Sequence, residues 1–204
     1  GELLYHGHSG LFEGWSELPG GKVWLWFRLA PGAERPPRGQ YVAGCDISSG
    51  TGSSNSAGCI AEQQTGEKYC EVVTPHMLPV DFARLMTALA RWFNNAFLIW
   101  EANGGPGSNF GYQVYEELGY KNVYFSAEDP HPEIGKNSRK DVPGCWTEKR
   151  TKELILAEYW RALVKGEYLN RSEFAIRDCK NYSYQEDGTV AHVKSRDRTV
   201  DPSG

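Results

Sequence analysis

Two acidic residues, Asp46 and Glu101, each end an apolar run and are followed by glycine-rich residues. Asp46 closes the run 41–46 before a Gly/Ser turn, and Glu101 directly follows the apolar run 96–100. Placing a carboxylate beside apolar strand residues costs several kcal/mol unless a cation, a hydrogen-bond partner or a proton compensates the charge. If the two acids meet in space, they predict a metal site.

An ordinary turn is the alternative explanation for Asp46. An aspartate before Ser and Gly commonly accepts backbone N–H groups and so forms the turn itself. Glu101 taken alone is explained more simply as a charge at the end of a strand. Both interpretations of Asp46 stay open, and the relative position of the two strands decides between them.

The composition is that of a globular domain. The chain has 204 residues, of which 40% are hydrophobic and 24% charged. No apolar run is long enough to cross a bilayer. The net charge of −4 argues against a protein covered in positive charge for sequence-independent nucleic-acid binding. It does not exclude a local basic groove.

Basic residues do gather in three places that could line such a groove. We take these clusters as candidate DNA-binding residues: Lys136, Arg139 and Lys140; Lys149, Arg150 and Lys152; and Lys194, Arg196 and Arg198.

The ends of the chain and its cysteines suggest the setting. The first residue is Gly and the last residues, 199–204, have the composition of a turn, so we expect an excised fragment. The 5 cysteines are scattered without zinc-ligand spacing, which indicates a reducing, intracellular environment. The scattered histidines likewise predict no metal site.

The pattern of apolar residues predicts a mixed α/β domain. Residues 1–40 are rich in Gly and Pro and are interpreted as an arm or linker, with one strand-like run at 22–28. Residues 41–204 form the expected domain. Its predicted elements are antiparallel strands 41–48, 56–64 and 67–74, a helix from Pro79 to Asn94, strand 96–101, a helix over 107–119, a short fifth strand at 122–125, a long loop over 126–147, a helix over 148–165, and a hairpin over 182–193 that turns at Asp187-Gly188.

The order of these elements predicts where the two acids lie. A strand, a helix and a strand in succession favour a right-handed crossover, which would place strand 96–101 parallel to strand 41–48. Asp46 and Glu101 would then stand side by side at the carboxyl ends of adjacent strands, where open α/β sheets form binding crevices. We assign the apolar residues of helix 148–165 to the core: Leu154, Ile155, Ala157, Tyr159, Trp160 and Leu163.

Three short motifs, in this order, resemble a known family. They are residues 44–52 around Asp46, Trp100-Glu101-Ala102-Asn103-Gly104, and Gly144-Cys145-Trp146-Thr147 before a charged helix. Together they resemble the nuclease domain of the large terminase subunit of tailed phages, within the ribonuclease H-like superfamily. The resemblance spans residues 41–204. It implies a mixed five-stranded central sheet with helices on both faces and a C-terminal β-hairpin.

The resemblance also implies an activity. Members cut concatemeric double-stranded viral DNA during genome packaging, in the cytoplasm of the infected bacterial host, alongside the portal and the small terminase subunit. It implies two Mg²⁺ or Mn²⁺ ions, with Asp46 and Glu101 as the first two ligands and as catalytic residues. The third acid of the family lies in a later motif that we expect beyond Gly204. Asp178 is the weaker candidate for it within this sequence.

Two other functions remain open. Residues 46–52 also resemble the first phosphate loop of sugar kinases and actin-like ATPases, a function that ATP binding would reveal. The chain could instead be a non-catalytic DNA-docking module. In that case Trp15, Trp24 and Trp26 could form an interface, although packing into the core is the simpler explanation.

Overall fold

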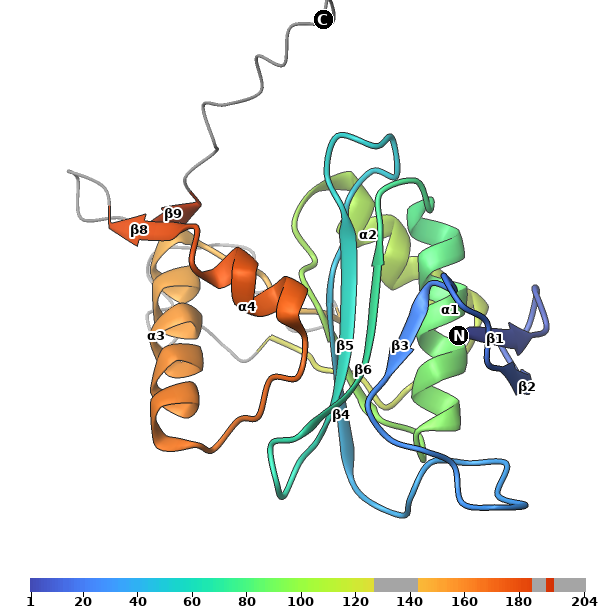
Figure 1. The fold of residues 1–204 in the computed structure, drawn as a ribbon. Coiled ribbons are helices and arrows are strands. Elements are labelled where there is room, and N and C mark those ends of the chain that lie inside the picture. Colours follow the sequence, from blue (N-terminus) through green and yellow to red (C-terminus); the bar gives the residue numbers. More distant parts are fainter. Residues whose placement is uncertain (127–142, 185–189, 193–204) are drawn as a thin grey trace, which may run out of the picture.

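The computed structural model describes residues 1–126, 143–184 and 190–192, and its centre is a mixed five-stranded sheet in the order β3-β6-β5-β4-β7. Strands β4 (Tyr41–Asp46), β5 (Ser56–Glu62) and β6 (Lys68–Thr74) form the predicted antiparallel meander. Figure 1 shows helices on both sides of this sheet. The mixed α/β class with a five-stranded sheet is therefore confirmed.

Helix α1 (Pro79–Trp92) covers one face of the sheet and contributes a continuous buried face to the core. It begins with Pro at its first turn and ends before Asn94 and Asn95, which both have positive φ. Its apolar stripe includes Phe82, Met86 and Leu89, all fully buried. The helical spacing read from the sequence thus predicted both the element and its buried face.

Strand β7 (Phe97–Trp100) lies parallel to β4, as the crossover rule predicted. Cys45 and Trp100 are register partners, and both are buried on the side of the sheet that α1 covers. Residues one position further along each strand point to the opposite face, because side chains alternate along a strand.

The first forty residues differ from the expected arm or linker. They contain β1 (Glu2–Tyr5) and β2 (Phe12–Ser16), which pair with each other, and β3 (Val23–Leu25), which pairs with β6 at the sheet edge. The rings of Phe12 and Trp15 stack on Trp92 of α1 at centroid distances of 5.2 and 5.6 Å. Aromatic packing therefore ties this Gly- and Pro-rich segment to the helix.

The expected fifth strand at 122–125 is wrong as a strand. Along β7 the backbone of Asn122 and Tyr124 bonds to Leu98, which makes a single bridge between Leu98 and Val123, and the chain then leaves β7. Cys145 takes the next place along β7: its N–H donates to Trp100 at 2.7 Å and its carbonyl accepts from Ala102 at 2.8 Å. Two short segments thus share the edge of β7, and β3 is the fifth strand instead.

The helix expected at 107–119 is present with a change of pitch. It runs as α2 (Gly104–Tyr112) and continues as a π-helix, η1 (Gln113–Glu117), before Gly119 in the left-handed conformation. A single π-helical turn inside a helix is rare and is often found near functional sites.

The C-terminal part contains α3 (Lys149–Lys165), α4 (Glu173–Cys179) and the paired strands β8 (Tyr182–Tyr184) and β9 (Val190–His192). In Figure 1 these elements lie on the side of the sheet opposite α1 and α2. The hairpin is confirmed, while its expected turn at Asp187-Gly188 lies outside the described residues. Helix α4 was not predicted.

The assignment of α3 to the core is wrong for most of its apolar residues. Leu154, Ile155, Ala157 and Trp160 are exposed, the last by 69%. Only Tyr159 and Leu163 of the predicted set are half-buried, and Tyr159 contacts the ring of Tyr168. The helix touches the rest of the molecule along one narrow face. None of the described helices is long and apolar enough to span a membrane.

Replacing Trp92 should test how much the N-terminal segment depends on α1. Trp92 is fully buried, and its indole N–H donates to the carbonyl of Glu34 at 2.7 Å. We expect Trp92→Ala to lower the free energy of unfolding by about 3–5 kcal/mol in urea titrations. The control Trp24→Ala, at a residue 62% exposed on β3, should change it by less than about 0.5 kcal/mol. If both substitutions lowered the free energy of unfolding equally, Trp92 would not be the residue that joins the N-terminal segment to α1.

Candidate active site

The parallel pairing of β4 and β7 brings Asp46 and Glu101 together. Each acid directly follows a partner of the Cys45–Trp100 pair, and the N–H of Glu101 donates to the carbonyl of Cys45 at 3.1 Å. The side chain of Glu101 lies close enough to Asp46 to act on its pKa through charge and as a hydrogen-bond partner. The juxtaposition expected from the sequence is therefore present in the structure.

The pKa of Asp46 is raised from its ordinary value, and the causes describe the site. Desolvation by the surrounding protein contributes most, followed by repulsion from Glu101 and by the hydrogen bond with Glu101. Asp46 as a whole residue is still exposed, so its carboxyl group is partly enclosed and partly open to solvent. A bound cation would relieve the repulsion between two carboxylates this close.

Two groups favour the ionised form of Asp46. The Lys152 ammonium of α3 lowers the pKa of Asp46, and so does a hydrogen bond from the backbone N–H of Ile47. The bond from Ile47 is the kind of contact that the turn interpretation of Asp46 predicts. Glu101 shifts the pKa of Asp46 more than Lys152 or Ile47 does, so turn formation explains only part of the surroundings of Asp46.

The loop after Asp46 is held by hydroxyl groups and glycines. The backbone N–H and Oγ of Ser48 lie 3.0 and 3.1 Å from Oγ of Ser56, and both residues are buried. Gly50 has φ +74°, and a Cβ there would lie 2.5 Å from the carbonyl oxygen of Met77. The loop therefore keeps its shape through contacts that leave the Asp46 carboxyl group available.

Glu101 is held from the opposite side by residues 143–147, which we call the 143–147 segment. The hydroxyl of Thr147 donates to Oε1 of Glu101. The same segment places Cys145 beside Glu101, and the pKa of the Cys145 thiol is raised by burial and then by the Glu101 charge. Thr147 belongs to a motif that the sequence singled out, but the sequence alone gave this residue no role.

Asp178 lies near the pair without joining it in a cluster. The pKa of the Tyr182 hydroxyl is raised first by desolvation, then by Asp178 and by Asp46, so both acids act on this tyrosine. Among the residues that the structure describes, no group of three or more His, Cys, Asp or Glu side chains could hold a metal ion. The structure therefore links Asp178 and Asp46 only through their effect on Tyr182, and it shows no ligand geometry that they share.

Most of the candidate DNA-binding residues lie in segments that the structure does not describe. Lys136, Arg139, Lys140, Lys194 and Arg196 lie outside the described residues, as does Arg198. Lys149 and Arg150 open α3, but their side chains are not described. Lys152 is the member of the three clusters whose side chain is described, and it acts on Asp46.

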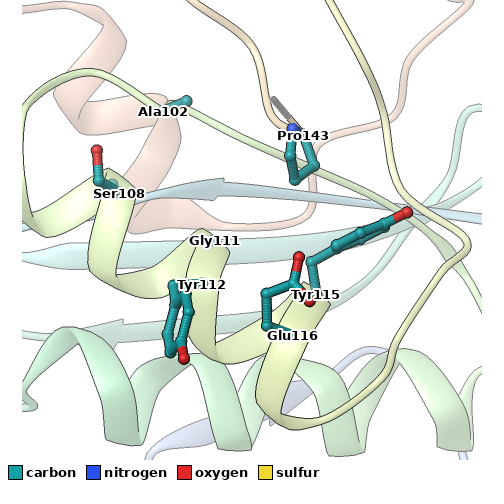
Figure 2. Close-up of a pocket in the computed structure, with 8 residues that line it drawn as sticks. Ala102, Ser108, Gly111, Tyr112, Tyr115, Glu116 and Pro143 are labelled. Carbon is teal, nitrogen blue, oxygen red and sulfur yellow. The ribbon is translucent and has the colours of Figure 1, made fainter. Parts of the chain in front are cut away.

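A small cavity of about 200 Å³ lies beside this region, on α2 and η1. Figure 2 shows Ser108, Tyr112, Tyr115 and Glu116 along the helix, with Pro143 across from them. Neither Asp46 nor Glu101 lines it. The acid pair and this cavity are thus separate features of the surface.

Solved structures with a similar fold are phage nucleases. The chain resembles the large terminase nuclease of thermophilic phage G20c with bound magnesium (15% identity, 92% of this chain and 85% of that chain, TM-score 0.59). It also resembles the zinc-bound form (14%, 88% and 88%, 0.54) and the Thermus phage P74-26 large terminase nuclease domain (14%, 91% and 82%, 0.55). No protein-family model matches the sequence, and no curated protein does. At this identity the likeness shows the fold.

The acid pair should destabilise the folded protein at neutral pH when no metal is present. Because the folded-state pKa of Asp46 is raised, its contribution to stability is greatest at low pH and is lost as pH rises through that pKa. We therefore expect Asp46→Asn to be more stable than wild type in EDTA near neutral pH, with a difference that shrinks on acidification. Urea unfolding between about pH 4 and pH 8 measures this.

The control for that measurement is Asp81→Asn, which removes an exposed acid paired with Arg84 on α1. It should show no such gain at neutral pH. If Asp46→Asn were less stable than wild type at neutral pH, the turn contact with Ile47 would dominate and repulsion would not.

Proposed function

We propose that this chain is a nuclease domain of a phage large terminase subunit, which cuts double-stranded DNA during genome packaging. The observation that carries the proposal is the Asp46–Glu101 pair at the carboxyl ends of two adjacent parallel strands. The similar fold of terminase nucleases supports it. The order of three antiparallel strands, a helix and a parallel fourth strand further favours a ribonuclease H-like sheet.

The acid pair fits a divalent cation. Carboxylate oxygens are the ligands that Mg²⁺ and Mn²⁺ prefer, and a bound cation would relieve the repulsion that Glu101 exerts on Asp46. The similar G20c nuclease was solved with magnesium and with zinc. We propose Mg²⁺ or Mn²⁺ for this chain, held by Asp46 and Glu101, with two ions and a contribution from Asp178 as the finer expectation.

Bound cations would activate the attacking water and stabilise the leaving oxygen of a phosphodiester. The side chains would hold the cations and set the charge of the site. Asp46 must be ionised to act as a ligand, so activity should rise with pH until Asp46, whose pKa is raised, has lost its proton. Lys152 offsets part of the negative charge at Asp46, and we propose that it also attracts the DNA backbone to the site.

The alternatives gain less support. A non-catalytic docking module has no need to keep two mutually repelling carboxyl groups in contact, and perturbed acids of this kind are concentrated at functional sites. The kinase or ATPase alternative rests on residues 46–52 alone. The portal and the small terminase subunit remain proposed partners, and the cytoplasm of an infected bacterium the proposed location.

Removing either carboxylate should abolish metal-dependent DNA cleavage. We expect Asp46→Asn and Glu101→Gln each to reduce nicking of supercoiled plasmid at least about 100-fold in Mg²⁺ or Mn²⁺, because each loses a ligand for the reacting ions. Asp81→Asn should cleave like wild type. Cleavage that proceeds equally in EDTA, or that survives Asp46→Asn, would exclude this mechanism.

The basic residues 136, 139 and 140 should contact the DNA backbone. Changing Lys136, Arg139 and Lys140 to Gln should weaken binding to unrelated DNA sequences alike. The slope of log affinity against log salt should fall by about 0.9 for each phosphate contact that is lost. Fluorescence anisotropy at several salt concentrations measures both effects, and Lys22→Gln is the control. If the slope is unchanged, these residues do not contact DNA, and the groove should be sought at Lys149, Arg150 and Lys152 at the start of α3.

A further inference from the structure

We propose that Thr147 is a positioning residue for the proposed metal site: its hydroxyl fixes the Glu101 carboxylate in the orientation that binds the cation. The inference rests on the proposed function and adds a residue to it. Thr147 donates its hydroxyl hydrogen to Oε1 of Glu101, and both residues are half-buried. A carboxylate has about four lone-pair sites, so this bond leaves acceptor capacity for an ion.

Thr147 is itself held at both of its backbone polar groups. Its N–H donates to Oδ1 of Asn103 at 2.9 Å, and its carbonyl accepts from Nδ2 of Asn103 at 2.5 Å. Asn103 lies only two residues after Glu101 in the sequence. The residue that orients Glu101 is therefore itself held by Asn103, which lies on the same loop as Glu101.

The rest of the 143–147 segment is attached to β7 independently of the Thr147 side chain. Cys145 makes backbone bonds to Trp100 and Ala102, and Gly144 accepts a bond from the hydroxyl of Ser126 at 3.0 Å. Gly144 has φ +104°, and a Cβ there would lie 2.8 Å from Nε1 of Trp100. Loss of the Thr147 hydroxyl alone should therefore leave the backbone of the segment in place.

Helix capping does not explain the hydroxyl of Thr147. The N-cap residue of α3 is Glu148, and no side chain makes a cap bond there. The hydroxyl bonds to Glu101 instead of to the first turn of the helix. Glu101 is repelled by Asp46. We expect the bond from Thr147 to hold the Glu101 carboxyl group in one orientation despite this repulsion.

Hydrogen bonds to a ligating carboxylate usually strengthen metal binding, and their loss typically costs about 10–100-fold in metal affinity or activity. The physical reason is that an ordered ligand loses less side-chain freedom when the ion binds. For Thr147 the effect should appear in metal affinity and in kcat. The KM for DNA should change little, because the hydroxyl has no role in holding the DNA backbone.

The chain supplies a matched control. In the β5–β6 turn, Thr65 donates its hydroxyl to Oε2 of Glu62 at 2.9 Å, which is the same kind of threonine-to-glutamate bond away from the acid pair. Thr65→Val removes it with the same change of shape as Thr147→Val. Thr147→Ser keeps the hydroxyl and removes only a methyl group.

The experiment measures Mn²⁺ affinity of the metal-free protein by isothermal titration calorimetry, together with plasmid cleavage and the melting temperature in EDTA. We expect Thr147→Val to weaken Mn²⁺ binding by about 10–100-fold and to lower kcat with little change in KM. Thr147→Ser should restore both, and Thr65→Val should bind Mn²⁺ like wild type.

Other outcomes overturn the proposal in distinguishable ways. If wild type binds Mn²⁺ and cleaves DNA while Thr147→Val matches it, the positioning role is wrong and the proposed function stands. If Thr147→Ser loses as much Mn²⁺ affinity and kcat as Thr147→Val, the hydroxyl is not the group that positions Glu101. If wild type neither binds Mn²⁺ nor cleaves DNA, the proposed function fails and this inference fails with it.

Discussion

The contact between two like-charged side chains is the constraint on which the site depends. Asp46 and Glu101 repel each other, and they stay together because the strands that carry them cannot separate. On the opposite face, Cys45 and Trp100 are buried beneath α1 and α2, so separating the strands would expose core residues to water. The hydrophobic core thus stabilises an arrangement that the acids alone would oppose.

The two faces of the sheet have correspondingly different properties. The face toward α1 is aromatic and closely packed, with Trp92 in contact with rings from β2 and from the segment after β3. The face toward α3 carries the acids, and α3 itself exposes most of its apolar residues. A rigid layer on one side therefore supports a more open, polar surface on the other, as expected for a site built on a fixed scaffold.

The sequence was informative where local patterns decide the structure. Helical spacing defined α1, short turns defined the β4–β6 meander, and the crossover rule put Glu101 next to Asp46. It failed where packing decides. The run at 22–28 was recognised as strand-like, but the surrounding Pro and Gly placed it in an arm, whereas β3 pairs with the free edge of β6. The amphipathic pattern of α3 resembled that of a core helix, but no pattern reveals how much of a helix finds a partner. The bond from Thr147 to Glu101 joins residues far apart in sequence and leaves no periodic signal.

The parallel pairing of β4 with β7 also determines when the acid pair can exist during folding. The β4–β6 meander and α1 precede β7 along the chain, so they can form while Glu101 is still remote from Asp46. Parallel pairing across a crossover is a non-local contact, so it requires closure of the loop between the two strands. A chain in which β4 and β7 have not yet paired contains Asp46 without its partner. If the pair is a nuclease centre, the chain acquires the capacity to damage DNA only on completing its sheet.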